Sequence, residues 1–281
     1  KCDFDSIITS MQDIYGSKCV PVQYPLQTGP GFNALIDVLL MKKYSWKPEG
    51  GEPVIEDIPA DQMDKAMELH KALVEAAAEN DEGLMEKFFE EETLTEDELR
   101  EGIRKGLYKF EHVQGKGKGE VQLLGSGAIL RHVREAAQIL ANDYGISSDV
   151  YSAPSFTEAA REGADAVRWN MLHPTETPRV PYVAQVMNDK PAVAATDYMK
   201  LFAEQIRAYV PAKHYHVLGT DGFGRSDSRA NLRDHFEVDA HHVVVAALHV
   251  LAQEGTVDKK VVAEAIAKYG IDPERLNPLY A

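Results

Sequence analysis

The sequence predicts an α/β protein in two parts. A three-layer αβα domain with a mostly parallel sheet is expected over residues 101–281, preceded by a smaller acidic α+β segment over residues 1–100. From Val121 to Tyr269, short apolar strands alternate with helical repeats, the pattern of βαβ units and a parallel sheet. Residues 1–99 hold 22 acidic against 8 basic side chains, whereas the rest of the chain holds 23 against 22. This step in charge indicates two segments with different partners.

The acidic segment is expected to begin with a helix over Phe4–Tyr15, where apolar residues recur at helical spacing. Cys19–Tyr24 alternates like a strand, which Pro21 confines to an edge or a strand start. A second strand is expected over Ala34–Leu40.

Two acidic helices are expected next. Asp61 can cap the first, whose apolar stripe comprises Met63, Met67, His70, Leu73, Val74 and Ala77. Its other face carries the candidate partner-binding residues Asp64, Glu68 and Glu75, together with Glu79. The second helix, near 83–91, is expected to bury Leu84, Met85, Phe88 and Phe89, and the capping box Thr95–Glu98 starts a third. Such an acidic face is either a solvated surface or a docking face for a basic protein, whose complementary field would speed association.

The second part is expected to start with a strand at Val121–Leu124 and a helix after Gly125-Ser126-Gly127. One face of that helix carries Ile129, Val133, Ala136, Ala137 and Leu140. Further strands are expected at Asp149–Ser152, Ala192–Ala195 and Tyr215–Leu218. Further helices are expected after the capping box Ser155–Glu158, through Leu201, Phe202 and Ile206 to Pro211, and near Asp239–Gln253 and Asp258–Tyr269, the last stopped by Gly270.

Two glycine-rich stretches resemble phosphate-binding loops only superficially. After Gly125-Ser126-Gly127 the third glycine of a dinucleotide fingerprint should stand where Leu130 is, so a tight strand-to-helix turn is the better interpretation. Gly115–Gly119 lacks the Ser or Thr that follows a phosphate loop, and we interpret it as a mobile hairpin tip.

Gly219–Asp227 is the most unusual stretch, because three glycines beside a strand end permit close backbone approach. Asp221, Arg225 and Asp227 could form an internal ion-pair network there or line a subunit boundary. The histidine pairs at 214/216 and 241/242 lack a third ligand at metal-site spacing, so we expect satisfied or solvent-facing histidines and no metal site.

Composition excludes several functional classes. Hydrophobic content of 44% and charged content of 27% are typical of a globular protein. No apolar run is long enough for a membrane helix, and Lys1 does not open a signal-peptide pattern. Two cysteines favour a reducing cytoplasm, and the formal net charge of −15 argues against direct nucleic-acid binding.

Several blocks within about residues 1–106 resemble bacterial elongation factor G, in the order of that family's G′ insert: 18–25, 31–38, 58–61, 84–88 and 94–98. The resemblance implies contact between the acidic helix and the ribosomal stalk protein. The loop G-x-x-x-x-G-K-[ST] and the Asn-Lys-x-Asp motif are absent, so no GTP hydrolysis is expected.

Residues 101–281 resemble the C-terminal domain of the homodimeric bacterial pyruvate dehydrogenase component. The blocks 122–127, 130–136, 168–174, 196–200, 219–227, 236–240 and 259–263 carry the likeness. It implies a transketolase C-terminal-like fold and a homodimer. Its parent enzyme uses thiamine diphosphate and Mg²⁺ to decarboxylate pyruvate, then acetylates the lipoyl group of the dihydrolipoyl acetyltransferase component.

The family's cofactor motif, Gly-Asp-Gly followed by Asn-Asn, is absent, as are the upstream domains that hold the cofactor. We therefore expect no cofactor-binding or catalytic residue in this chain and a structural or dimerisation role. Residues 101–106 fit both families, which indicates a chimera. The alternative is an elongation factor G fragment without a GTP site.

Overall fold

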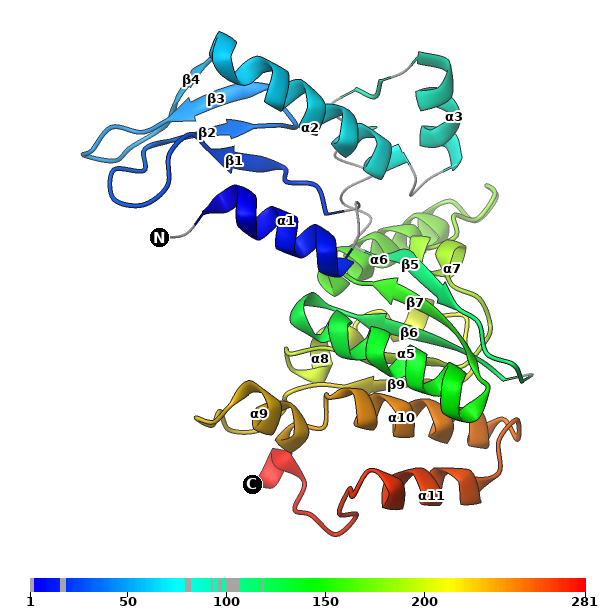
Figure 1. The fold of residues 1–281 in the computed structure, drawn as a ribbon. Coiled ribbons are helices and arrows are strands. Elements are labelled where there is room, and N and C mark those ends of the chain that lie inside the picture. Colours follow the sequence, from blue (N-terminus) through cyan, green and yellow to red (C-terminus); the bar gives the residue numbers. More distant parts are fainter. Residues whose placement is uncertain are drawn as a thin grey trace. The chain divides into compact units, whose positions relative to one another are not determined.

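The computed structural model describes residues 3–15, 19–78, 82–91, 93–95, 98–99, 107–117 and 119–281. The chain divides into two compact units, Lys1–Arg104 and Lys105–Ala281. In Figure 1 the first runs from blue to cyan and the second from green to red. None of the described helices is long and apolar enough to cross a membrane.

The first unit contains a four-stranded antiparallel sheet, with strands in the order β1-β2-β3-β4. The strands are β1 (Gln23–Pro25), β2 (Ala34–Asp37), β3 (Lys42–Ser45) and β4 (Val54–Glu56), and the helices are α1 (Phe4–Tyr15), α2 (Ala60–Ala78) and α3 (Glu82–Glu91). The core residues Tyr24, Ile36, Val38, Ile58, Ala66 and Leu73 join sheet and α2. A second cluster, Val74, Ala77, Ala78, Leu84, Leu94 and Leu99, joins α2 and α3.

Several predictions for this unit are confirmed. The helix over Phe4–Tyr15 and the helix near 83–91 are present, and β1 is an edge strand, although it begins at Gln23 and leaves Pro21 outside. Both predicted strands are shorter than expected, and β3 and β4 were missed. The Thr95 amide donates to Glu98 Oε2 at 2.8 Å and the Glu98 amide to Thr95 Oγ1 at 3.4 Å, as in a capping box. The predicted junction at 101–106 lies outside the described residues.

The predicted apolar faces of the two acidic helices need correction. Asp61 is not the cap, because α2 already begins at Ala60. The buried side of α2 runs along Ala66, Leu73, Val74 and the following alanines, so Met63 and Met67 lie outside it and are exposed. On α3 the predicted burial of Leu84 is confirmed, but Phe89 is 77% exposed. Alanine side chains allow helices to pack closely, so the larger side chains beside them stay at the edge of the contact.

The second unit is built on a five-stranded sheet with the order β5-β7-β6-β8-β9. The strands are β5 (Tyr108–Val113), β6 (Glu120–Gly125), β7 (Ser147–Ser152), β8 (Ala192–Ala195) and β9 (Tyr215–Leu218). β6 to β9 are parallel and β5 is antiparallel, which confirms the predicted α/β class with a mostly parallel sheet.

Helices cover both faces of this sheet. One layer holds α5 (Leu130–Tyr144) and α10 (Ala240–Gln253), with α11 (Lys259–Lys268) packed on α10. The other holds α6 (Phe156–Leu172), α7 (Tyr182–Val186) and α8 (Lys200–Glu204). The turns η1 (Gly127–Ile129), η2 (Arg207–Tyr209) and η3 (Pro278–Tyr280) and helix α9 (Arg229–His235) complete the unit.

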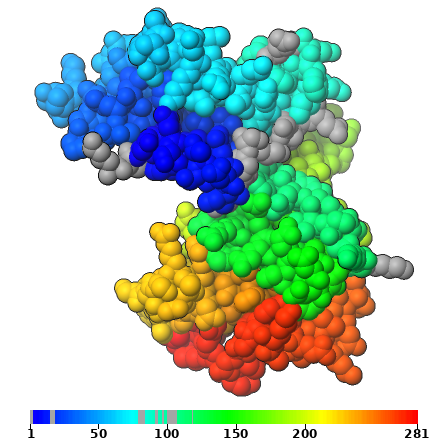
Figure 2. All heavy atoms as spheres, in the orientation of Figure 1, coloured from blue at the N-terminus to red at the C-terminus, as the bar shows by residue number. Residues whose placement is uncertain are grey.

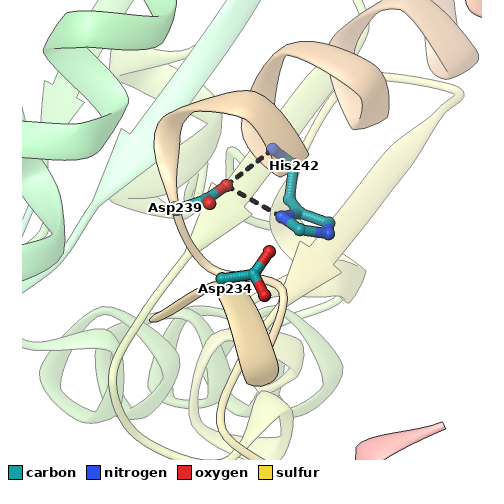
Figure 3. Close-up of side chains that lie close together, drawn as sticks. All are labelled: Asp234, Asp239 and His242. Carbon is teal, nitrogen blue, oxygen red and sulfur yellow. Dashed lines mark hydrogen bonds and ion pairs between the residues drawn. The ribbon is translucent and has the colours of Figure 1, made fainter. Parts of the chain in front are cut away.

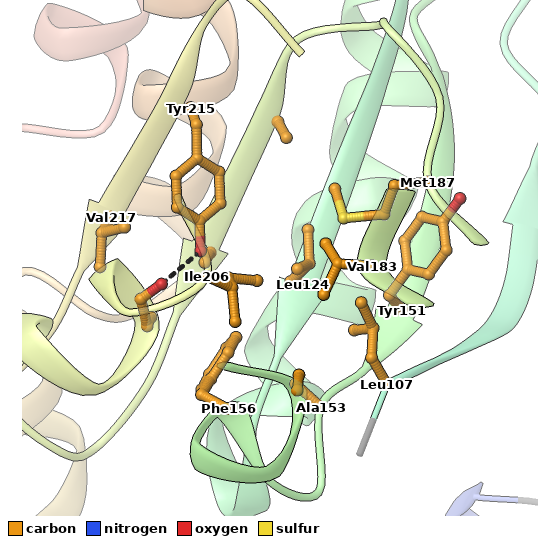
Figure 4. Packing of buried hydrophobic residues seen from close by; sticks show 14 of the residues in the cluster. Leu107, Leu124, Tyr151, Ala153, Phe156, Val183, Met187, Ile206, Tyr215 and Val217 are labelled. Atoms are coloured by element: carbon orange, nitrogen blue, oxygen red, sulfur yellow. Dashed lines mark hydrogen bonds between the residues drawn. The ribbon is translucent and has the colours of Figure 1, made fainter. Parts of the chain in front are cut away.

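The core between the sheet and the α6–α8 layer is shown in Figure 4. Leu124 of β6 and Tyr215 of β9 face Phe156 of α6, Val183 of α7 and Ile206, which lies between α8 and η2. Tyr215 also donates its hydroxyl to the Ala203 carbonyl at 2.8 Å, so its buried polar atom is satisfied.

The helix signals of this unit are confirmed at the residues that carry them. The predicted stripe of α5 is at most 1% exposed throughout. Ser155, Asp239 and Asp258 accept a first-turn amide at the starts of α6, α10 and α11. The predicted helix through Ile206 is two short pieces, α8 and η2.

The interpretation of Gly115–Gly119 as a hairpin tip is wrong. β5 and β6 flank these glycines but do not pair, because β7 lies between them in the sheet. The Gly117 amide donates to the Gly145 carbonyl at 2.6 Å, and a Cβ on Gly117 would stand 2.8 Å from that oxygen. Glycine is therefore needed for close backbone packing.

Candidate functional site

The carboxyl ends of β6, β8 and β9 form the candidate site of the second unit. From β6 the chain proceeds through α5 to β7 on one side, and later strands β8 and β9 lie on the other side. The direction of strand addition thus reverses between β6 and β8. Ligands of open α/β sheets bind in the crevice outside such a switch point.

Two hydroxyl residues close the bottom of this crevice. Ser126 follows β6 and Thr196 follows β8, and both are buried. Their hydroxyl oxygens lie 2.7 Å apart, and Thr196 Oγ1 also accepts from the Tyr198 amide at 3.2 Å. These hydroxyls tie the two strand ends together.

A groove of about 560 Å³ opens above these strand ends. It is lined by Ala128, Ile129, Asp197, Thr220, Gly222, Gly224, Arg225, Arg229, Leu232, Arg233, Phe236 and Val238. The lining therefore combines an apolar wall with three guanidinium groups and one carboxylate. The loop after β9 and helix α9 supply most of it, and their yellow and gold atoms reach the surface in Figure 2.

The three arginines differ in their surroundings. Arg233 Nη1 donates to His132 Nε2 at 2.8 Å. Burial, and next the charge of Arg233, lower the pKa of His132, so a neutral imidazole accepts this bond. Within the described residues, neither Arg225 nor Arg229 forms an ion pair with a carboxylate.

The predicted site residues of the loop after β9 do not form a network. Asp221 Oδ1 accepts the Lys200 amide at 3.1 Å and fixes the start of α8. Asp227 Oδ1 accepts the Ser228 amide at 2.6 Å and the Asn231 amide group at 2.8 Å. Arg225 is exposed and lines the groove, and no ion pair joins these three described residues. The ion-pair network is therefore wrong, because amide groups rather than Arg225 donate to both aspartates, while the subunit boundary stays a prediction.

Asp197, Arg229 and Arg233 also line the groove and were not predicted as site residues. Arg225, Arg229 and Arg233 recur every four residues, a signal that could have indicated one basic face. The loops that complete the groove are separated by up to about a hundred residues, so spacing alone could not assemble it.

Asp234, Asp239 and His242 form a compact cluster at the start of α10 (Figure 3). Asp239 Oδ1 accepts from the His242 amide at 2.9 Å and lies 2.8 Å from Nδ1 of the ring. Arg275 Nη1 donates to Asp234 Oδ2 at 2.8 Å, and its Nη2 lies 3.5 Å from His242 Nε2. A guanidinium thus stands where a cation would bind, and the cluster fastens the C-terminal segment.

The prediction that the histidines are satisfied or face the solvent is confirmed for some of them and wrong for another. His242 is buried and satisfied, and His216 packs edge-on against His249 with ring centroids 6.1 Å apart. His214 departs from the prediction, because its buried Nε2 has no hydrogen-bond partner.

The predicted acidic residues of the first unit share a surface with an apolar groove. Asp64, Glu68 and Glu75 are all exposed on α2. A groove of about 630 Å³ between α2 and α3 is lined by Met67, Glu68, His70, Lys71, Val74, Glu75, Phe88, Phe89 and Thr93. This groove was not predicted, because helical spacing placed Met67 and Phe89 in the core.

Comparison with known proteins classifies the second unit. Residues 106–239 match the model of the transketolase-like TK C-terminal domain. This stretch has the transketolase C-terminal fold. The five-stranded sheet with its four parallel strands agrees with that class.

Three relatives of this transketolase-type domain are pyruvate dehydrogenase E1 components. That of Haemophilus influenzae is 78% identical over 182 residues, that of Escherichia coli K12 is 74% identical over 181, and that of Pseudomonas aeruginosa is 59% identical over 181. Each alignment covers 64% of this chain and 20% of the relative. The chain thus spans about a fifth of their length.

These matches do not support the resemblance of residues 1–106 to elongation factor G, nor a chimera, and both stay predictions. A crystal structure of a Thermus thermophilus protein aligns with 38% of this chain and 16% of its own, at 26% identity. Its TM-score of 0.32 is too low to carry an argument.

Proposed function

We propose that the second unit is the C-terminal domain of a pyruvate dehydrogenase E1 component. The identity of 78% over 182 residues carries this proposal. By resemblance, the whole enzyme decarboxylates pyruvate with thiamine diphosphate and Mg²⁺. It then acetylates the lipoyl group of the dihydrolipoyl acetyltransferase component in the cytoplasm.

We propose that the described residues of this chain do not hold that cofactor. A Mg²⁺–diphosphate group needs open oxygen ligands. The cluster with ligand-like spacing in the described residues, Asp234, Asp239 and His242, is occupied by Arg275. We therefore propose that this chain supplies no group to the reacting centre.

Its proposed role is association. The loop after β8 and helix α8 expose the apolar side chains of Tyr198, Met199, Leu201 and Phe202. A cluster of exposed apolar side chains is typical of an interface. We propose that a second copy of the domain covers it in a homodimer.

A domain exchange tests the proposed family role. Replacing the matched C-terminal segment of the Escherichia coli E1 component by residues 107–281 should keep its pyruvate-dependent rate within about threefold, because no group at the reacting atoms changes. The rate is measured in the reconstituted complex, with the truncated enzyme as control. A soluble, dimeric exchange enzyme as inactive as the truncated one would contradict the proposal.

The groove beside Glu68 and Glu75 supports a second proposed function, which concerns the first unit. We propose that α2 and α3 bind a basic protein module such as the ribosomal stalk protein. Exposed Met67 and Phe89 would supply apolar contact, and the acidic rim would steer the partner.

Neutralising the acidic rim should weaken this binding. Glu68→Gln combined with Glu75→Gln is expected to reduce affinity for the basic module about tenfold at low salt, and less at high salt because ions screen exposed charges. Fluorescence anisotropy with the full chain measures the change. Glu52→Gln, exposed between β3 and β4, is the matched control. No binding, or a flat salt response, would count against the proposal.

A further inference from the structure

The groove at the carboxyl ends of β6, β8 and β9 is basic in a nearly neutral part of the chain. Residues 100–281 hold 23 acidic against 22 basic side chains, whereas Arg225, Arg229 and Arg233 face one acid, Asp197, in the groove lining. Arg229 and Arg233 stand four residues apart on α9, where like charges repel. A bound anion would relieve this repulsion.

We propose that this groove binds a small phosphate ester. A guanidinium presents a planar fork of donors that matches phosphate oxygens, so arginines are the side chains expected at such a site. Arg225 and Arg229 are free of carboxylate partners in the described residues and can turn toward the ligand. His132 holds Arg233 by its 2.8 Å hydrogen bond, so that guanidinium is already oriented.

The apolar part of the lining indicates an ester rather than inorganic phosphate alone. Half-buried Leu232 and Phe236 give the groove apolar surface that a bare anion would leave uncovered. The volume of about 560 Å³ lies within the usual range of small-molecule sites. The apolar wall would accept the body of the ester while the arginines hold its phosphate.

The glycines of the loop after β9 leave the groove open to a ligand. An added Cβ at Gly224 would meet no atom within 4 Å, so the backbone there borders open space. Gly222 has φ +105°, and a Cβ there would collide with the Pro278 carbonyl. The C-terminal segment thus supports the loop from behind while its other side faces the groove.

The site needs no cofactor and stands independently of the proposed E1 role. Calorimetry with the full chain would use adenosine 5′-monophosphate as the ester probe, inorganic phosphate as the bare anion, and adenosine and citrate as controls. We expect saturable binding of the monophosphate, weaker binding of phosphate and none of adenosine. Adenosine binding as tight as its monophosphate, or citrate binding tighter than both phosphate probes, would overturn the proposal.

Arginine variants locate the site. Arg225→Ala and Arg229→Ala should each weaken monophosphate binding about tenfold, the loss expected for one charge-assisted contact, and Arg229→Lys should weaken it less. Arg168→Ala removes an equally exposed charge from α6 and should leave affinity unchanged. Equal losses in Arg168→Ala and Arg229→Ala, or no saturable monophosphate binding by the unaltered chain, would refute the assignment. Unchanged circular dichroism of the variants checks the fold.

Discussion

Gly125→Ala is expected to lower the free energy of unfolding of the second unit by about 2–3 kcal/mol, because it overpacks the core. Gly125 ends β6, directly beneath the first turn of α5. A Cβ there would stand 2.7 Å from Leu130 Cα and 3.1 Å from Val133 Cγ2. The nearest atom is backbone, so the strand and the helix must separate to admit the methyl group.

Gly224→Ala is the matched control, because a Cβ there meets no atom within 4 Å and the backbone is not left-handed. It should change the free energy of unfolding by less than about 0.5 kcal/mol. Hydrogen exchange of the β6 and β8 amides in the full chain measures the second unit separately from the first. If both substitutions lowered the free energy of unfolding equally, the contact between β6 and α5 would not be tight.

The contrast between these glycines illustrates what local sequence can predict. The tight turn at Gly125-Ser126-Gly127 and the stripe of α5 follow from residues close together in the chain, and both are confirmed. The same holds for the cap Ser155 and for the helix starts near Asp239 and Asp258. Capping and periodicity are short-range properties.

Capping and periodicity could not predict which distant strands and side chains come together. β5 alternates only over Tyr108–Glu111 and is interrupted by a register shift, and its partner β7 lies beyond β6 in the sequence. The Asp234–Arg275 ion pair spans 41 residues, and the basic groove joins the ends of three strands. Tertiary contacts alone decide these features.

The surface of α2 shows a second limit of prediction from sequence. Helical spacing correctly predicted one apolar face, but not which residues the neighbouring elements would cover. Ala66 and Ala77 are buried, while the larger Met67 is 58% exposed. A periodic pattern fixes the direction of a face only within about one residue position, because neighbouring positions lie about 100° apart.

Asp239→Ala is expected to lower the free energy of unfolding by about 2–4 kcal/mol, since it removes a helix cap and a buried hydrogen bond together. Asp239 accepts the first-turn amide of α10, and nine residues of that helix are buried. It also lies 2.8 Å from Nδ1 of His242, whose side chain is 8% exposed. Without the carboxylate, that ring nitrogen stays buried without its partner.

Asp239→Asn separates the two contributions. Its side-chain oxygen can still cap α10, so only the charge-assisted part is lost, and a decrease of about 1 kcal/mol is expected. Urea denaturation of the full chain, again followed by hydrogen exchange of the second unit, measures both variants. A loss in Asp239→Asn as large as in Asp239→Ala would show that the charge, and not the cap, dominates.

The effect of Asp239→Asn should also depend on pH. Burial alone would raise the pKa of Asp239, but the hydrogen bonds from the side chain and the amide of His242 outweigh it, and the pKa lies below its ordinary 3.8. The folded state therefore binds this proton less readily than the unfolded state. The stabilisation is complete above about pH 4 and is lost as the pH falls through the lowered pKa. The two proteins should consequently differ at about pH 7 and converge as the pH falls below the lowered pKa, where the folded carboxyl group binds its proton. A difference that stays constant over this range would mean that the charge of Asp239 does not stabilise the fold.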